Sequence, residues 1–253
     1  NKQASAGDAA YLYYFRRGSF NKNISKILSA TLLQLSLKKY IAFSEDNTKS
    51  KPQVRINILN STEQLEPLTE DEKTVLGILK SVTRDTTKEG KIATFTMKEF
   101  EKYAKKHCES FMSKIKSIET DVEKQQIAMQ NYSEESKKQA SKYVGKSTIY
   151  IVLGIICMSI APIIGILLII NAIPYFIMTN KTRQLTDKGL EEKAKWVGLK
   201  RYMEDFSLLN EKEVPDLKLW EKYLVFATAF GIADKVLKQL KIRYPELQNI
   251  DGY

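Results

Sequence analysis

The sequence of 253 residues predicts a mainly α-helical chain with a small β-ribbon. Residues 147–180 contain no charged side chain. Elsewhere apolar residues recur at helical spacing, and two short segments between residues 40 and 58 alternate like strands. We therefore predict a small α+β domain (1–95), a long amphipathic helix (96–146), a transmembrane hairpin (147–180) and a C-terminal helical segment (181–253) that packs on the amphipathic helix.

The first 95 residues predict a winged-helix-like domain. An aromatic helix over residues 9–17 is expected to end at Gly18, because glycine commonly terminates helices. A second helix over residues 23–37 begins at Asn23, a frequent N-cap residue. Strands are predicted at residues 40–43 and 54–58 around a polar turn (44–52), and a further helix begins after Thr69. Helix, helix, strand, strand, helix is the order of a winged-helix-like domain. The apolar faces of the two longer helices comprise Ile24, Ile27, Leu28, Thr31, Leu32, Leu35, Val75, Leu76, Ile78 and Leu79.

A winged-helix-like domain raises the possibility of DNA binding through the helix over residues 23–37. That helix has Lys26 as its cation before Lys38 and Lys39, and it has no arginine for bidentate contacts to guanine. Asn23 and Gln34 lie at opposite ends of it. We expect a protein-contact or structural role for this domain and keep a membrane-tethered nucleic-acid-binding regulator as the alternative.

The amphipathic helix predicted over residues 96–146 has an apolar stripe close to the heptad spacing of a coiled coil. Gln125 interrupts the stripe and Met129 resumes it. The stripe must be buried against another helix, either within this chain or in a second copy, and we expect burial within the chain. Its members are Phe100, Ala104, Cys108, Phe111, Ile115, Ile118 and Val122.

The charge-free segment is predicted to enter a membrane. Residues 149–178 include twelve Ile, three Leu, one Val and one Phe. At about −0.3 to −0.6 kcal/mol each, these residues favour insertion by roughly 5 to 10 kcal/mol. Soluble buried helices rarely contain such a long apolar run.

The same segment fits a short helical hairpin better than one span. A single helix of 34 residues would be about 51 Å long, against about 30 Å of hydrocarbon. Pro162 and Gly165 lie near the midpoint, where a turn would place them. Lysine and arginine flank both ends, which the positive-inside rule places in the cytoplasm. A single span remains the alternative. The flanking cations are Lys137, Lys138, Lys142, Lys146, Lys181, Arg183 and Lys188.

Two helices are predicted after the hairpin. The first covers residues 190–206, with Trp196, Leu199 and Met203 on one side. The second starts at Asp216, a plausible N-cap after Pro215, and ends at Pro245. We expect its apolar stripe to pack antiparallel on the stripe of residues 100–122. This second stripe comprises Leu219, Tyr223, Phe226, Phe230, Ala233, Leu237 and Leu240.

No residue combination points to catalysis, a cofactor or a metal. His107 is the single histidine, and we expect it to be an ordinary helix-surface residue. Cys108 and Cys157 are expected to be reduced, since two cysteines make no disulfide framework. The acidic pairs at positions 191–192 and 204–205 lie among lysines on predicted amphipathic helices and indicate solvated faces.

The net charge of +10 lies mainly before the hairpin: residues 1–146 have 26 Lys and Arg against 18 Asp and Glu. Such a surface is attracted to anionic lipid headgroups.

Three segments resemble the YciQ-like predicted bacterial membrane proteins (domain of unknown function 2207), C-terminal part. They are AAYLYYFRRGSF together with ATLLQLSLKKYIAF, then LTDKGLEEKAKWVGLKRYMEDFS, and LWEKYLVFATAFGIADKVLKQL. The resemblance implies an extracytoplasmic domain and a membrane helix upstream of Asn1, and it implies no reaction or catalytic residue.

We therefore expect a non-enzymatic integral membrane protein of the bacterial cytoplasmic membrane, multi-pass, with both polar segments cytoplasmic. Its expected partners are the lipid bilayer and a protein partner or a second copy bound through the amphipathic helix, and nucleic acid is not expected. A second rival interpretation is an enzyme whose active site lies mostly upstream of Asn1.

Overall fold

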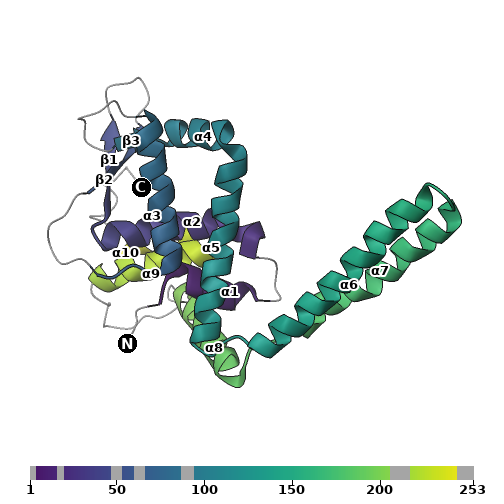
Figure 1. Cartoon of the computed structure of the whole chain (residues 1–253). Coiled ribbons are helices and arrows are strands. Elements are labelled where there is room, and N and C mark those ends of the chain that lie inside the picture. Colours follow the sequence, from purple (N-terminus) through teal and green to yellow (C-terminus); the bar gives the residue numbers. More distant parts are fainter. Residues whose placement is uncertain are drawn as a thin grey trace. The chain divides into compact units, whose positions relative to one another are not determined.

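The computed structural model describes residues 4–15, 20–46, 53–59, 66–86, 94–205 and 217–243. It divides into two compact units, each considered by itself (Figure 1). Unit 1 comprises residues 1–124 and 193–253, and unit 2 comprises residues 125–192. The N-terminal region predicted as one domain thus shares unit 1 with the first part of the predicted amphipathic helix and with the C-terminal helices.

Helices dominate unit 1, and a small antiparallel sheet accompanies them, which confirms the mainly helical prediction. Before residue 107 the elements are α1 (Ala6–Tyr14), the 3-10 helix η1 (Phe20–Asn23), α2 (Ile24–Leu37), β1 (Ile41–Asp46), β2 (Gln53–Ile58), α3 (Glu70–Thr86), β3 (Thr94–Thr96) and α4 (Met97–Lys106). After it come α5 (Cys108–Ala128), most of α8 (Asp187–Asp205), α9 (Leu217–Phe230) and α10 (Ala233–Arg243). Gly18, the turn after position 46, Asp216 and Pro245 lie outside the described residues.

The sheet has three strands in the order β1-β2-β3, one more than the predicted ribbon. Ile41 pairs with Ile58 in β2, and Arg55 pairs with Thr96 in β3. The sequence predicts a helix at Thr96, and the structure gives this residue two roles. It closes β3 and caps α4, because its side chain accepts a hydrogen bond from the Glu99 amide and the Glu99 side chain accepts one from the Thr96 amide.

The prediction of one long helix over residues 96–146 is wrong, because the structure breaks this segment twice. Helix α4 ends with His107 as its C-cap, and α5 follows directly. Helix α5 ends in a Schellman motif, where Gln130 has φ +60° and the Asn131 amide donates to the Gln126 carbonyl at 2.9 Å. The next helix, α6 (Glu134–Met158), has Ser133 as its N-cap.

The apolar stripe of α5 is buried inside unit 1 in its second half, as expected, whereas Cys108 at its start is exposed. Ile115, Ile118 and Val122 are buried members of the core. Helix α5 is bound to α3 through hydrogen bonds from the Thr74 hydroxyl to Asp121 (3.0 Å) and from the Lys114 ammonium to the Ser81 hydroxyl (3.0 Å).

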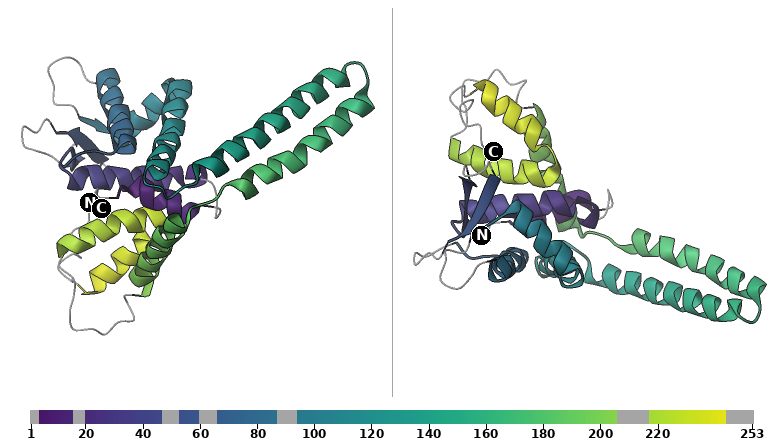
Figure 2. Two further views of the ribbon diagram at one scale, coloured as in Figure 1. Left: turned by 60° about the horizontal axis from the view of Figure 1, so that its bottom comes forward. Right: turned by 90° about the horizontal axis from the view of Figure 1, so that it is seen from above.

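The C-terminal helix does not pair with α5 as predicted; α9 packs on α1 and α2 (Figure 2). The Tyr14 hydroxyl donates to the Ala229 carbonyl at 3.1 Å, and the rings of Tyr13 and Phe230 lie 4.8 Å apart. The predicted single helix is also interrupted, because Gly231 has φ +75° and ends α9. The apolar stripe predicted the burial of Phe230 but not its packing partners, α1 and α2.

Helix α8 contributes the apolar side predicted for it. Met203 is fully buried, and the rings of Trp196 and Phe226 lie 5.0 Å apart. This contact joins α8 to α9 within unit 1.

Candidate functional site

Unit 2 contains a helical hairpin of α6 (Glu134–Met158) and α7 (Pro162–Thr182). The two helices pack side by side along their length (Figure 1). They are joined by three residues, 159–161, and Pro162 is the first residue of α7, where its missing amide costs no hydrogen bond. The predicted hairpin geometry, with a turn at Pro162, is therefore present in the structure.

Two glycines allow the helices of the hairpin to approach closely. A Cβ atom on Gly154 would lie 2.6 Å from Cγ1 of Ile169 and 3.0 Å from the Gly165 carbonyl oxygen. A Cβ atom on Gly165 would lie 2.7 Å from the Gly154 carbonyl oxygen. No side chain fits at either position without moving a helix. Gly165, which the sequence assigned to the turn, thus lies one helical turn inside α7.

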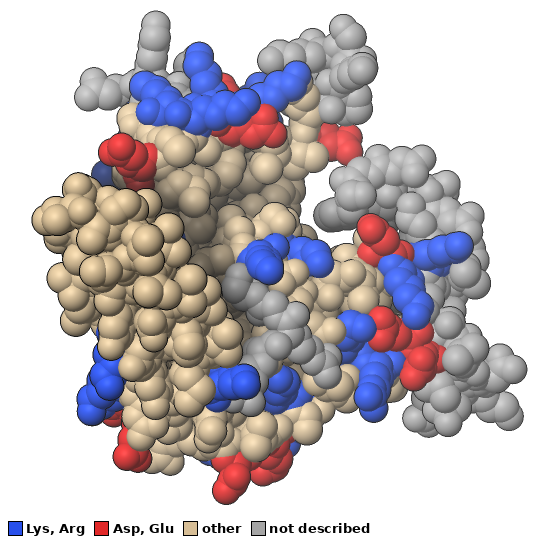
Figure 3. All heavy atoms as spheres, turned by 90° about the vertical axis from the view of Figure 1, so that its right-hand side faces the viewer, with Lys and Arg blue, Asp and Glu red and all other residues tan. Residues whose placement is uncertain are grey.

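The surface of the hairpin is apolar and exposed. Ile160 is 86% exposed and Ile163 is 76% exposed. Among the described residues, Pro162–Thr182 is a helix long and apolar enough to cross a membrane, and only 11% of its most apolar window is buried. Residues 147–180 contain no Lys, Arg, Asp or Glu, and a broad surface without charged side chains is visible at the left of Figure 3. Water solvates such a surface poorly, whereas lipid chains match it.

Several polar side chains within the hairpin donate hydrogen bonds to carbonyls of its own helices. The Ser147 hydroxyl donates across the hairpin to the Ala172 carbonyl at 3.3 Å, and the Asn171 amide donates to the Leu167 carbonyl at 2.9 Å. The Thr148 hydroxyl donates to the Val144 carbonyl at 2.9 Å. Internal partners of this kind are what a low-dielectric environment requires.

The base of the hairpin is a polar clamp of backbone and side-chain hydrogen bonds. The Ser133 amide donates to the Gln184 carbonyl at 3.2 Å, and the Gln184 amide donates to the Ser136 hydroxyl at 3.1 Å. Arg183 donates to the Tyr132 hydroxyl at 3.0 Å. These bonds hold the start of α6 and the end of α7 together at the charged end of the hairpin.

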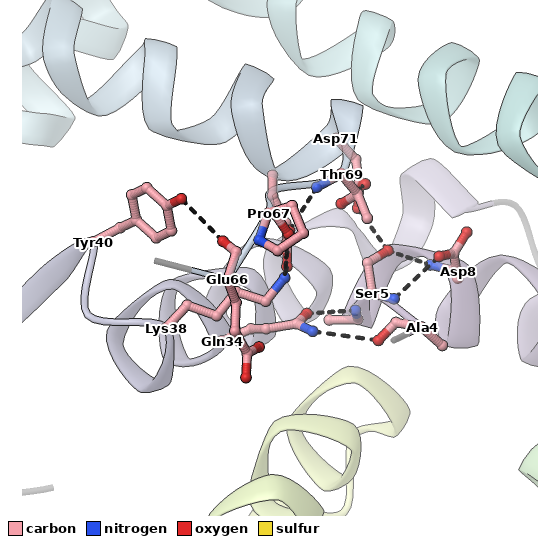
Figure 4. Close-up of polar contacts among 12 residues, drawn as sticks. Ala4, Ser5, Asp8, Gln34, Lys38, Tyr40, Glu66, Pro67, Thr69 and Asp71 are labelled. Carbon is pink, nitrogen blue, oxygen red and sulfur yellow. Dashed lines mark hydrogen bonds and ion pairs between the residues drawn. The ribbon is translucent and has the colours of Figure 1, made fainter. Parts of the chain in front are cut away.

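A second polar cluster lies in unit 1, where α1, α2 and α3 meet (Figure 4). The Ser5 hydroxyl donates to Asp71 at 2.9 Å, and the Ser5 amide donates to Asp8 at 3.0 Å. The Gln34 carboxamide oxygen accepts from the Ala6 amide at 2.7 Å. The side chains of Ser5, Asp8, Gln34 and Asp71 are all buried.

Burial raises the pKa of Asp71 to about 6. Hydrogen bonds from Thr69 and Ser5 lower this pKa, while the nearby carboxylates of Asp8 and Glu72 raise it further. A buried carboxyl with a pKa near neutrality is a candidate for a pH-dependent contact between helices. The cluster is a structural junction, since Asp71 is bound by the hydroxyl groups of Ser5 and Thr69 from the chain itself.

The neighbouring Lys38 and Glu72 form a buried ion pair. Both Glu72 oxygens lie 2.8 Å from the Lys38 ammonium, and the two side chains are 6% and 0% exposed. The Thr69 amide also donates to Glu72 at 2.8 Å. The sequence places Lys38 at the end of a possible DNA-reading helix, whereas in the structure it binds the start of α3.

The single histidine and the cysteines lie apart from these clusters. His107 is the C-cap of α4 and joins it to α5; it is half-buried, with its ring 4.7 Å from that of Tyr103. Cys108 is exposed on α5, Cys157 lies on α6, and both are free thiols. Within the described ranges no three His, Cys, Asp or Glu residues are placed to hold a metal ion.

The comparisons with known proteins identify a family for the whole region just described. Residues 6–240 match the family described as "Predicted membrane protein (DUF2207) C-terminal domain". No curated protein and no solved structure matches the chain significantly. The match covers unit 2 and the described part of unit 1 up to α10, and it confirms the resemblance drawn from three sequence segments. The chain therefore belongs to the DUF2207 family of predicted membrane proteins.

Proposed function

We propose that this chain is a non-enzymatic anchor-and-platform protein of the bacterial cytoplasmic membrane. Helices α6 and α7 insert into the bilayer, and unit 1 is a cytoplasmic body for partner binding or signal relay. The observation that carries the proposal is the exposed surface of the charge-free residues 147–180, where several polar side chains donate hydrogen bonds to helix carbonyls. The buried carboxylates support a structural body, because Asp71 and Glu72 are engaged in contacts between helices.

The orientation of this proposal follows from the cations at the hairpin base. Lys137, Lys138, Lys142 and Lys146 precede the uncharged segment, and Lys181 and Arg183 follow it. Because Lys and Arg are retained in the cytoplasm, both ends of the hairpin belong on that side. Unit 1 then has its two chain segments, 1–124 and 193–253, in one compartment.

Membrane insertion can be tested with a double substitution, Ile163→Lys with Ile166→Lys. Each change replaces a favourable residue by one costing about 2.5 to 3.5 kcal/mol at the bilayer centre. We expect the unchanged chain to stay in the pellet after alkaline carbonate extraction and the variant to be released or degraded. The matched control is Val144→Lys, which changes an exposed position on the lysine-rich part of α6. Release of the unchanged chain by carbonate would overturn the proposal.

Orientation can be tested on the native exposed thiol. In a Cys157→Ser variant, Cys108 of unit 1 reports the side of the membrane. We expect an impermeant maleimide to label Cys108 in inverted vesicles and not in right-side-out vesicles. Labelling in right-side-out vesicles would place unit 1 outside the cell and contradict the cytoplasmic assignment.

The alternative of a winged-helix nucleic-acid-binding regulator has less support. The order α1, α2, β1, β2, α3 is that of a winged-helix-like domain, but α2, its candidate reading helix, packs against α9. Gln34, a residue that could contact bases, is buried against Ala6. Binding to duplex DNA at low ionic strength, with an affinity that falls steeply as salt is added, would support this alternative.

Self-association through the amphipathic helix also has less support than partner binding by other surfaces. Ile115, Ile118 and Val122, its apolar contacts, are already in the core of unit 1. Sedimentation of the full chain in detergent tests this point, and a stable dimer lost on substitution of exposed Met112 on α5 would favour self-association.

A further inference from the structure

We propose that the hairpin is re-entrant: its tip, residues 159–163, ends among the lipid acyl chains and does not reach the opposite aqueous face. The inference rests on the proposed membrane insertion and goes beyond it, since the sequence predicted a short transmembrane hairpin without fixing its depth. The occupant of the exposed tip surface is lipid hydrocarbon.

The first argument is the charge-free length of the shorter arm. In α6 the last charged residue is Lys146, so residues 147–158 are its uncharged part. Twelve helical residues extend about 18 Å, whereas the hydrocarbon core is about 30 Å thick. The arms are in register, because the Ser147 hydroxyl bonds to the Ala172 carbonyl. The uncharged distance from Lys146 to the tip of the hairpin is therefore shorter than the thickness of the hydrocarbon core.

The second argument is the chemistry of the tip. Ile160 and Ile163 are the most exposed large apolar side chains among the described residues, at 86% and 76%. The amides of Ile160 and Ala161 donate to the Cys157 carbonyl at 3.0 and 2.7 Å, and Pro162 has no amide hydrogen. A turn that emerges into water gains nothing from exposed isoleucines, whereas a turn in hydrocarbon needs both apolar side chains and satisfied amides.

The third argument is that the aromatic residues lie at one end of the hairpin. Tyr150 stacks on Tyr175 at 5.4 Å, Tyr143 lies 6.4 Å from Tyr175, and the Lys146 ammonium lies 5.8 Å from the Tyr175 ring centroid. Residues 151–174 contain no Phe, Tyr or Trp. Segments that cross a bilayer have aromatic belts at both interfaces. One belt, beside the lysines, indicates one interface.

The test uses the full chain with Cys108→Ser and Cys157→Ser, into which one cysteine is placed at a time. Ile160→Cys reports the tip, and Ser141→Cys, on the exposed base of α6, is the matched control. An impermeant maleimide is applied to right-side-out and to inverted vesicles. We expect the tip cysteine to react from neither side until detergent is added, and the base cysteine to react in inverted vesicles.

The outcomes separate the depth of the hairpin from its orientation. Reaction of the tip cysteine in right-side-out vesicles would overturn the re-entrant hairpin while leaving membrane insertion intact. Reaction of the base cysteine in right-side-out vesicles would instead overturn the cytoplasmic orientation.

A nitroxide on the same tip cysteine gives a second readout. We expect high accessibility to oxygen, low accessibility to a polar nickel reagent, and a depth about 26 Å greater than that of the base position, because 17 helical residues separate Ser141 from the end of α6. Low oxygen accessibility together with disulfide-linked dimers through residue 160 would show that a second copy covers the tip and would overturn lipid contact.

Discussion

The Ser5 hydroxyl donates a 2.9 Å hydrogen bond to Asp71, which lies 66 positions later in the chain. Ser5 is also the N-cap of α1, since its side chain accepts from the Asp8 amide at 3.0 Å. The Ser5 hydroxyl therefore both caps α1 and links this helix to α3. Gly7 passes so close to Asp71 that a Cβ atom there would collide with the carboxylate.

The substitution Asp71→Asn should flatten the pH dependence of stability. Because burial raises the folded-state pKa of Asp71 from 3.8 to about 6, the native state binds the proton more tightly than the unfolded chain. The contribution of Asp71 to the free energy of unfolding is fully present below about pH 4 and is lost as the pH rises to 6. At pH 7 the variant should be more stable than the unchanged chain by up to about 3 kcal/mol.

Thermal unfolding of both proteins in one detergent between pH 4 and pH 8 checks this prediction. The two curves should converge at pH 4, separate between pH 4 and pH 6, and stay a constant distance apart above pH 6. Parallel curves over the whole range would show that Asp71 does not carry the pH dependence.

The buried pair Lys38–Glu72 should be costly to break from one side. Lys38→Met leaves the Glu72 carboxylate buried without its cation, and such changes cost about 3–5 kcal/mol. Lys38→Met with Glu72→Leu should recover most of this loss, because no buried charge remains. The exposed pair Lys73–Glu70, at 2.7 Å, is the matched control, and Lys73→Met should cost below about 1 kcal/mol.

Chemical unfolding of the four proteins at one pH measures these differences. Equal losses for Lys38→Met and Lys73→Met would contradict the assignment of the pair to the buried interior. A double variant less stable than the single one would show that the pair itself, and not the stranded charge, dominates.

Two glycine substitutions to alanine should have opposite signs. Gly77 lies in α3, and a Cβ atom added there would have nothing within 4 Å, so alanine should stabilise the helix by about 0.5–1 kcal/mol. Gly231 has φ +75°, and a Cβ atom there would lie 2.8 Å from the Lys26 ammonium. Alanine at this position should cost about 1–2 kcal/mol. The unfolding midpoint of each variant, compared with that of the unchanged chain, checks the two predictions. If Gly231→Ala left the midpoint unchanged, the left-handed conformation of Gly231 could not be the reason why α9 ends there.

The same left-handed conformation explains why helix ends were harder to predict than helices. The break between α9 and α10 has a glycine at the left-handed position, but α2 and α5 end with Lys39 and Gln130 there, each at φ +60°. Lysine and glutamine do not favour a left-handed conformation. The end of α5 was therefore not predicted, and one helix was expected over residues 96–146. Strand β3 was missed because three residues pair with β2 only after the fold brings them together.

The two candidate sites differed in how much of them was predictable. The hairpin was predicted because a charge-free run and Pro162 are local features of the sequence. The junction of Ser5, Gln34 and Asp71 was not, since its hydrogen bonds join residues 28 to 66 positions apart. Asp71 is a first-turn acid of α3, and nothing local in the sequence indicates that its carboxyl is buried.

The glycine contact in the hairpin should control how closely α6 and α7 pack. Gly165→Val places a side chain where a Cβ atom alone would lie 2.5 Å from Cγ of Met158, so the helices must separate or shift. Gly145→Val, in α6 with open space around it, is the matched control. The readout is a disulfide between Ser147→Cys and Ala172→Cys, positions joined across the hairpin by a hydrogen bond, in a chain without its native thiols. Because a disulfide requires Cα atoms within about 7 Å, separation of the helices should lower the cross-linking yield severalfold in Gly165→Val and leave it unchanged in Gly145→Val. Equal yields in the two variants would show that the hairpin tolerates side chains at its crossing and that close packing there does not determine its geometry.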